Sequence, residues 1–181
     1  AKKPNFLIFL LVSMAVAGMM QFYFLGSAQF MIDNGISGKA VPASMAIAQG
    51  AQAIATFLCL GGIANLNPDW TWTITGSIGY QWTLVAGAAC WLLLYVVYVA
   101  TTSREALITI QAFHGVAYVF FMIGGQFYCN AVAAPEIQST VQALIFAATT
   151  GVGLFVGTQL AGIVMDACKA EGKFQWKKIW M

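Results

Sequence analysis

Long apolar stretches separated by short polar turns dominate the chain. The eight basic and six acidic residues leave five charge-free runs, at residues 4–32, 40–68, 70–103, 106–135 and 137–165. A helix crosses a bilayer with about 20 mainly apolar residues, whereas a membrane barrel shows shorter alternating segments. Because the runs are continuous, the pattern predicts helices rather than strands. We expect them at residues 6–32, 41–66, 83–101, 106–130 and 137–166.

Turn-forming residues separate these expected helices. Asn34 and Gly35 mark the first reversal, and Pro42 suits the first turn of the helix that follows. The connection between the second and third helices is longer and carries Trp70 and Trp72, which we interpret as anchors at the membrane interface. The other connections are short, which favours antiparallel neighbouring helices.

Small residues in the expected helices predict close packing. Gly153 and Gly157 lie four residues apart in the last helix, and Gly124 and Gly125 are adjacent in the one before it. Such flat patches allow the backbones of two membrane helices to approach closely. We therefore expect both helices to contact their partners at these glycines.

The ends of the sequence indicate a longer natural chain. No initiator Met is present, and residues 177–181 place two lysines and a tryptophan beside apolar residues. Basic and aromatic side chains at this position are typical of the interface ahead of a membrane span. We expect residues 177–181 to begin a further helix.

Composition supports an all-α polytopic integral membrane protein. The chain is 60% hydrophobic and 8% charged, whereas an average soluble domain is about 25% charged. The net charge of +2 lies at segment ends, which gives no signal for a nucleic-acid partner. The four cysteines are isolated, and we find no grouping that predicts a metal site, a cofactor or the nucleophile and base of an enzyme.

Two polar stripes stand out inside the apolar runs. An ionisable residue within a membrane span is a functional candidate, and His114 is the clear case. At 100° per residue, His114 shares a stripe of about 80° with Gln111, Tyr118, Met122 and Cys129. On the second expected helix, Met45, Gln49, Gln52 and Thr56 share a stripe of about 60°. We interpret the two stripes as facing walls of one cavity.

These side chains suit a neutral, polar ligand that contains a flat ring. Glutamine both donates and accepts hydrogen bonds, and tyrosine stacks on rings, so Gln21, Gln49 and Tyr118 could recognise a base or sugar without charge. Glutamines in membrane helices also bond neighbouring helices, which is the alternative for Gln49 and Gln52, and more so for Gln138 and Gln142 near a helix end. The alternative for His114 is a bond to a backbone carbonyl.

Several motifs in order carry a resemblance to a known family. The stretch from Phe6 to Asp166 resembles the seventh to eleventh helices of the nucleoside:proton symporter family, within the major facilitator superfamily. The motifs are PASMAIAQ at 42–49, GYQWTL at 79–84, HGVAYVFF at 114–121, QALIF at 142–146 and GIVMD at 162–166.

The resemblance implies a fold and a missing half. The family has two six-helix bundles that expose a midplane substrate cavity alternately to each side. This chain would supply five spans of the C-terminal six-helix domain, and the N-terminal six-helix half would precede it. That topology places the N-terminus on the cytoplasmic side, whereas the lysine and arginine count of the loops favours the outside.

The resemblance also assigns site residues. Gln21 and Gln49 match substrate-binding glutamines of the family, Gln52 stands where an acidic residue is usual, and His114 and Tyr118 occupy aromatic positions. Val119 replaces an acidic residue implicated in proton coupling. Coupling could then pass through His114, whose imidazole titrates in a usable pH range.

The sequence therefore predicts a multi-pass transporter of the bacterial inner membrane. We expect it to take up nucleosides by proton symport, binding them through Gln21, Gln49, Gln52, His114 and Tyr118. The alternatives are a facilitator, a transporter of another small polar solute, or a membrane receptor or subunit that keeps the fold without transporting.

Overall fold

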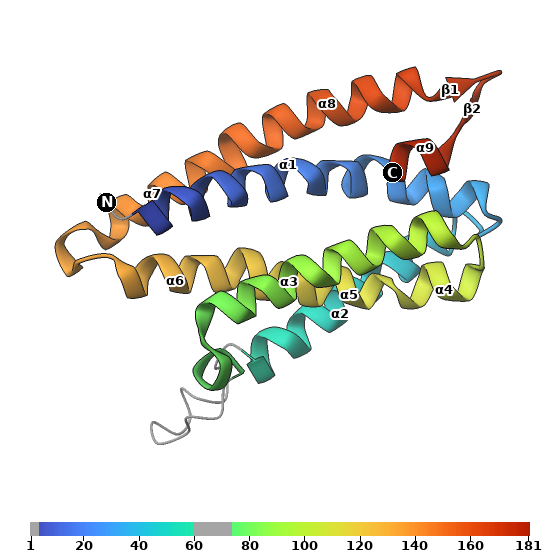
Figure 1. Ribbon diagram of the computed structural model, residues 1–181. Helices are drawn as coiled ribbons and strands as arrows, with labels where there is room; N and C mark the ends of the chain where they lie inside the picture. The colour runs from blue at the N-terminus through green and yellow to red at the C-terminus, as the bar shows by residue number, and fades with distance from the viewer. Residues whose placement is uncertain (1–3, 60–73) are drawn as a thin grey trace. The chain divides into compact units, whose positions relative to one another are not determined.

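The computed structural model describes residues 4–59 and 74–181, and these form helices joined by short turns (Figure 1). They divide into two compact units, which we describe separately. Unit 1 combines Ala1–Phe30 with Cys129–Met181, and unit 2 is Met31–Tyr128. The predicted interfacial anchors Trp70 and Trp72, and the expected end of the second helix at residue 66, lie outside the described residues.

In the described part of the chain, the elements are consecutive helices and one small hairpin. Their bounds are α1 Pro4–Asp33, α2 Val41–Cys59, α3 Ile74–Ala100, α4 Arg104–Thr109, α5 Gln111–Ala117, η2 Tyr118–Ile123, α6 Gly124–Val132, η3 Pro135–Ile137, α7 Gln138–Phe146, η4 Ala147–Gly153, α8 Leu154–Ala167, β1 Lys169–Ala170, β2 Lys173–Phe174 and α9 Trp176–Trp180.

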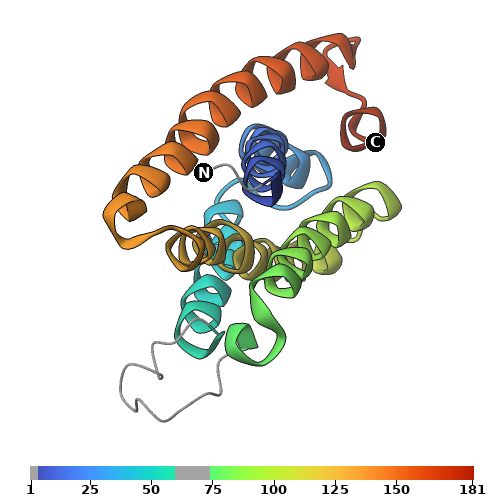
Figure 2. The ribbon, with the colours of Figure 1, turned by 60° about the vertical axis from the view of Figure 1, so that its left-hand side comes forward.

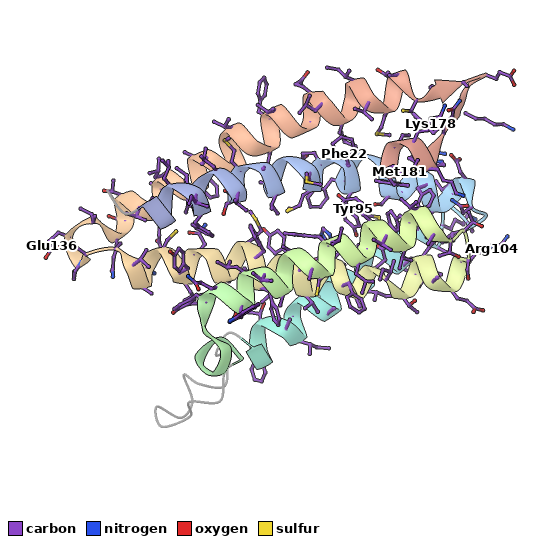
Figure 3. The ribbon with its side chains drawn as sticks, viewed as in Figure 1. Phe22, Tyr95, Arg104, Glu136, Lys178 and Met181 are labelled. Atoms are coloured by element: carbon purple, nitrogen blue, oxygen red, sulfur yellow. The ribbon has the colours of Figure 1, made fainter. Side chains whose placement is uncertain are left out.

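Within the described residues, four helical stretches are long and apolar enough to cross a membrane. They are Phe6–Asp33, Gly79–Ala100, Arg104–Val132 and Pro135–Ala167. Three charged side chains are labelled in Figure 3: Arg104 begins α4 and Glu136 lies in the turn before α7, both at the start of a stretch, whereas Lys178 lies in α9, outside the four stretches. The fold is therefore that of an all-α polytopic membrane protein, as the sequence pattern predicted.

The helix α3 differs from the expectation at its start. It begins at Ile74 rather than near residue 83, and its helical geometry breaks at Gly79, where φ is 78° and ψ is 163°. Residues with a side chain rarely adopt this conformation, so a glycine is required at the break. Thr83 closes the first turn after it, because its hydroxyl donates to the Gly79 carbonyl at 3.0 Å.

In unit 1, α1 packs against the long helical stretch from α7 to α8, which curves beside it in Figure 2. One end of this pair is held by apolar side chains: Phe6 of α1 is clustered with Cys129, Val141 and Ile145. The glycines of η4 and α8 lie against the middle of α1, and this confirms the close packing that the Gly153 and Gly157 pair predicted.

Aromatic rings close the other end of unit 1. After the β1–β2 hairpin, α9 places Trp176 and Trp180 in a stack with ring centroids 5.7 Å apart. Both rings contact Phe30 of α1, each at 5.4 Å between centroids. Trp180 also covers Gly26, where a side chain would overlap the indole. The segment after α8 therefore folds back onto α1.

In unit 2, α5 lies between α2 and α3 and contacts both. Its continuation η2 carries Val119 and Phe120, which form an apolar cluster with Ala55 of α2. On the α3 side, Gly87 brings the two backbones together, since a Cβ there would lie 2.8 Å from the Phe121 nitrogen. The α5–η2 stretch is thus the central element of this unit.

Two of the membrane-length stretches contain π-helical turns, η2 in one and η4 in the other. A π-helical turn admits an extra residue and rotates the side chains that follow it, and such turns are frequent at functional sites. A straight helical wheel therefore misplaces residues beyond Tyr118 and beyond Ala147.

Candidate functional site

The predicted site residues fall in both units, with Gln21 in unit 1 and the other four in unit 2. Gln21 lies on α1 with 9% of its surface exposed. The hydroxyl of Thr158 on α8 donates to its Oε1 at 3.1 Å. This bond orients the amide group and leaves its nitrogen with two hydrogens to offer an acceptor.

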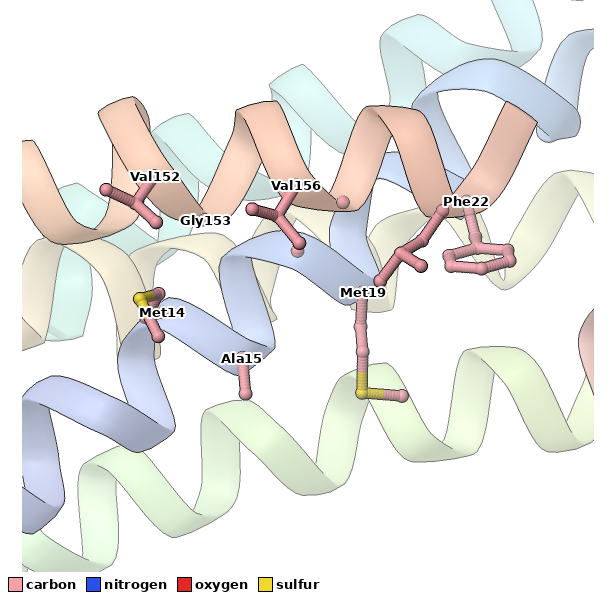
Figure 4. Close-up of a pocket in the computed structure, with 10 residues that line it drawn as sticks. Met14, Ala15, Met19, Phe22, Val152, Gly153 and Val156 are labelled. Carbon is pink, nitrogen blue, oxygen red and sulfur yellow. The ribbon is translucent and has the colours of Figure 1, made fainter. Parts of the chain in front are cut away.

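Gln21 lies one turn from the closest helix contact of unit 1. Gly157 of α8 touches the backbone of Gly18, and a Cβ on Gly153 would lie 2.7 Å from the Met14 carbonyl oxygen. Along this contact the two helices border a partly open pocket of about 260 Å³, which is shown in Figure 4. Its lining is apolar, with Met14, Met19, Val152 and Val156 among the side chains. Gln21 is not among the side chains that line this pocket, so the pocket is not formed around its amide.

The α2 glutamines of unit 2 lie beside a tight helix contact. Ala48 is buried and its carbonyl meets Gly115 of α5, where a Cβ would overlap that oxygen. Gln49 is exposed and Gln52 is half-buried. Since the backbones of α2 and α5 touch at Ala48 and Gly115, the two polar stripes are not opposite walls of a cavity at this level, contrary to our interpretation of the sequence.

His114 is buried on the α3 side of α5, with 4% of its surface exposed. The indole Nε1 of Trp91 donates to its Nδ1 at 3.2 Å, and the two ring centroids lie 6.2 Å apart. An indole N–H only donates, so His114 Nδ1 must accept, and the proton of the neutral imidazole lies on Nε2. The alternative from the sequence was that His114 bonds a backbone carbonyl. At Nδ1 the observed partner is instead the indole N–H of Trp91.

Two other glutamines hold helices together. Gln111 is fully buried, and its Nε2 donates to the Tyr98 hydroxyl and to the Leu107 carbonyl, both at 2.8 Å. Gln138 donates from Nε2 to the Asn130 carbonyl at 3.2 Å. The Gln111 bonds lie within unit 2 and the Gln138 bond lies within unit 1, as expected for residues that fix helix packing.

Tyr118 and Val119 begin the π-helical turn η2. Tyr118 is half-buried, whereas Val119 has no exposed surface and packs with Ala55 and Phe120. An acidic residue at position 119 would be surrounded by apolar side chains, where an unpaired charge is costly. The valine therefore fits the packing that is observed.

Sequence reasoning missed Trp91 and Thr158. Both are partners of predicted site residues, one bonded to His114 and the other to Gln21. A signal for Trp91 was available, because a buried indole N–H usually finds an acceptor. Thr158 follows Gly157, so it lies next to the point where the helices touch, but nothing in the sequence identified α1 as the partner helix.

The burial pattern, the four membrane-length stretches and the polar side chains inside them define a multi-pass helical membrane protein. Among the residues that the structure describes, no three His, Cys, Asp or Glu side chains gather at one place.

The family model described as "Nucleoside H+ symporter" matches residues 1–181, so the chain belongs to that family.

Curated relatives agree with this assignment over part of their length. Xanthosine permease of Escherichia coli is 29% identical over 82 residues, which are 45% of this chain and 20% of the permease. The nucleoside permease NupG of E. coli and that of Shigella flexneri are each 26% identical over 68 residues, 38% of this chain and 16% of theirs. The matches thus cover a fifth or less of each relative. No solved structure matches the chain.

Proposed function

We propose that this chain is part of a transporter that takes up nucleosides across the bacterial inner membrane together with protons. The observation that carries the proposal is the match to the nucleoside H+ symporter family along residues 1–181. The named relatives, a xanthosine permease and two nucleoside permeases, support a nucleoside as the solute. In this account the chain works with a preceding half of the same protein by alternating access.

The amides of the membrane helices are the groups we assign to the solute. A nucleoside is uncharged and carries donors and acceptors on both base and sugar, which an amide can match in pairs. Gln49 is exposed on α2 and Gln52 is half-buried, so both can reach a ligand without unfolding the unit. Gln21 offers an amide that Thr158 already holds in place. Tyr118 supplies a ring for stacking on the base.

The proton in this proposal passes through His114. It is the single histidine of the sequence, and the charged residues lie at helix ends, outside the apolar runs. The ring is bonded to Trp91 in its neutral form. Its protonation would therefore change a contact between α3 and α5, and such a change is what coupling requires.

A facilitator is the second candidate, and a specific observation favours it. Val119, at the position where the family resemblance places an acid, is fully buried among apolar side chains. Without that acid, transport could proceed down the nucleoside gradient alone. The two candidates differ in one measurable property, namely accumulation against a concentration gradient.

The test is uptake of radiolabelled uridine and adenosine by proteoliposomes that contain the full-length protein. We expect saturable accumulation when an inward proton gradient is imposed, and loss of accumulation when an ionophore removes the gradient. Equilibration without accumulation would favour the facilitator. Absence of saturable uptake for both solutes would contradict nucleoside transport and favour another solute or a non-transporting role.

A further inference from the structure

We propose that Trp91 is the positioning residue for His114: it holds the imidazole as the Nε2–H tautomer, and their contact must open when the ring takes up a proton. This inference rests on the proposed function, in which His114 takes part in proton coupling. It adds Trp91 on α3 to the residues that take part in proton coupling. In this proposal, protonation of His114 changes the contact between α3 and α5.

The contact is built to fix the orientation of both rings. Trp91 is 5% exposed and His114 is 4% exposed, so neither ring exchanges its partner for bulk water without a structural change. Phe121 packs on the same indole with ring centroids 5.8 Å apart, which restricts its rotation. The Trp91 Nε1 to His114 Nδ1 distance of 3.2 Å is within hydrogen-bonding range.

The chemistry of the two groups makes the contact sensitive to protonation. An indole can only donate, and a protonated imidazole donates from both nitrogens and accepts at neither. In the neutral ring, the Nδ1 lone pair receives the Trp91 hydrogen. A proton added at Nδ1 would face that hydrogen directly, so the two nitrogens must separate. Protonation of His114 and the Trp91 bond are therefore mutually exclusive.

The described residues of α2, α3 and η2, the elements that pack most closely against α5, include no carboxylate. In α2, residues 41–57 contain no ionisable side chain. The described part of α3 contributes Cys90 and three tyrosines, of which Tyr98 is already bonded to Gln111. η2 contributes Tyr118, and α4 begins with Arg104 and Glu105, which are exposed at its start. The Trp91 indole is thus in direct contact with the ring, and its hydrogen bond depends on the charge of His114.

The helix packing next to the contact allows a small movement to spread. Gly87, one turn before Trp91, lies against the backbone of Phe121 in η2. A π-helical turn interrupts the regular α-helix and is frequent at functional sites, so η2 is the part of this helix that we expect to adjust first. Opening the contact between Trp91 and His114 would therefore change the positions of Tyr118 and the residues that follow it in η2.

A tautomer measurement tests the resting state without reference to transport. The full-length protein is labelled with 15N-histidine, and the His114→Gln variant identifies the His114 signal by its loss. At neutral pH we expect an unprotonated Nδ1 and a protonated Nε2. A ring protonated at Nδ1, or at both nitrogens, would overturn the proposal even if uptake is normal.

An uptake measurement then tests the coupling. Trp91→Phe keeps an aromatic ring and removes the N–H, and Trp82→Phe is the matched control, because Trp82 lies on the same helix with 66% of its surface exposed. Loss of one neutral hydrogen bond corresponds to about half to one pH unit. Because Trp91 favours the neutral ring, Trp91→Phe should move the pH midpoint of uptake upward by that amount, whereas Trp82→Phe should leave it in place.

The two measurements separate the possible failures. If the wild-type protein transports no nucleoside, the proposed function fails, and the 15N spectrum still decides the tautomer. If uptake is robust and the pH midpoint of Trp91→Phe equals that of the wild type, the coupling role of Trp91 is wrong. His114→Phe serves as the reference, since it should abolish the pH dependence altogether.

Discussion

Gly157 of α8 lies directly on the backbone of Gly18 of α1, so close that Gly157 has no room for a side chain. Such contacts replace the hydrophobic effect as the main attraction between membrane helices, because lipid tails are as apolar as leucine. The contact lies one turn from Gln21 on α1 and next to Thr158 on α8, and the hydrogen bond between these two side chains joins the same two helices. The geometry of the Gln21 amide therefore depends on two small residues.

Gly157→Ala should destabilise the protein. The added Cβ would overlap the backbone of Gly18, and overpacking of this kind costs about 1–3 kcal/mol. Gly162→Ala is the matched control, because it lies on the same helix and its Cβ would meet no described atom within 4 Å. Thermal unfolding in detergent is the measurement. Equal midpoints for the two variants would show that the close contact is absent.

Gly115→Ala should have a similar effect in unit 2. Its Cβ would overlap the Ala48 carbonyl and lie 2.8 Å from the Gln52 nitrogen, both of them backbone atoms that cannot move aside cheaply. We expect a loss of about 1–3 kcal/mol. Gly50→Ala, on α2 with no described atom within 4 Å of the added carbon, should not reduce stability. A stable Gly115→Ala protein would contradict the α2–α5 contact.

Much of the fold followed from the sequence because the bilayer simplifies the problem. A continuous apolar run must be helical, since every backbone group needs a partner inside the segment. The contact made by Gly153 and Gly157 was also predictable, because two glycines four residues apart leave one helix face flat. The break at Gly79 was not, since a glycine inside an apolar run is compatible with both a kinked and a straight helix.

The orientation of the candidate site residues was harder to predict. The helical wheel directed His114 toward the α2 stripe, whereas the structure places it against Trp91 of α3. The side of α5 that faces α2 is occupied by Gly115, because the smallest residue allows the closest approach. Beyond Tyr118 the π-helical turn changes the angular step, so a wheel at 100° per residue no longer applies.

Thr158→Val tests whether Gln21 is a ligand-binding residue or only a link between helices. Valine keeps the shape of threonine and removes the hydroxyl that donates to Gln21 Oε1. If Gln21 binds nucleoside, its freed amide should raise the KM for uptake about two- to tenfold, the equivalent of one hydrogen bond. Thr149→Val is the control, because that hydroxyl bonds within its own helix to Ile145. An unchanged KM together with reduced stability would leave Gln21 with a structural role only.

Gln49→Ala should weaken nucleoside binding without affecting folding. Gln49 is exposed on α2, so its removal leaves no cavity in the unit. Loss of its hydrogen bonds to the solute should raise the KM about two- to tenfold. Gln159→Ala removes an exposed glutamine from α8 and serves as the comparison. Identical uptake kinetics in wild type and Gln49→Ala would remove this residue from the binding site.

The most direct test of proton-coupled nucleoside transport is a measurement of the proton itself. Proteoliposomes containing the full-length protein and an internal pH-sensitive dye are given external uridine or adenosine, with no pH gradient imposed. The account predicts that nucleoside addition acidifies the interior in proportion to uptake and that His114→Phe abolishes the acidification. Nucleoside entry with no change in internal pH would contradict it and identify the protein as a facilitator.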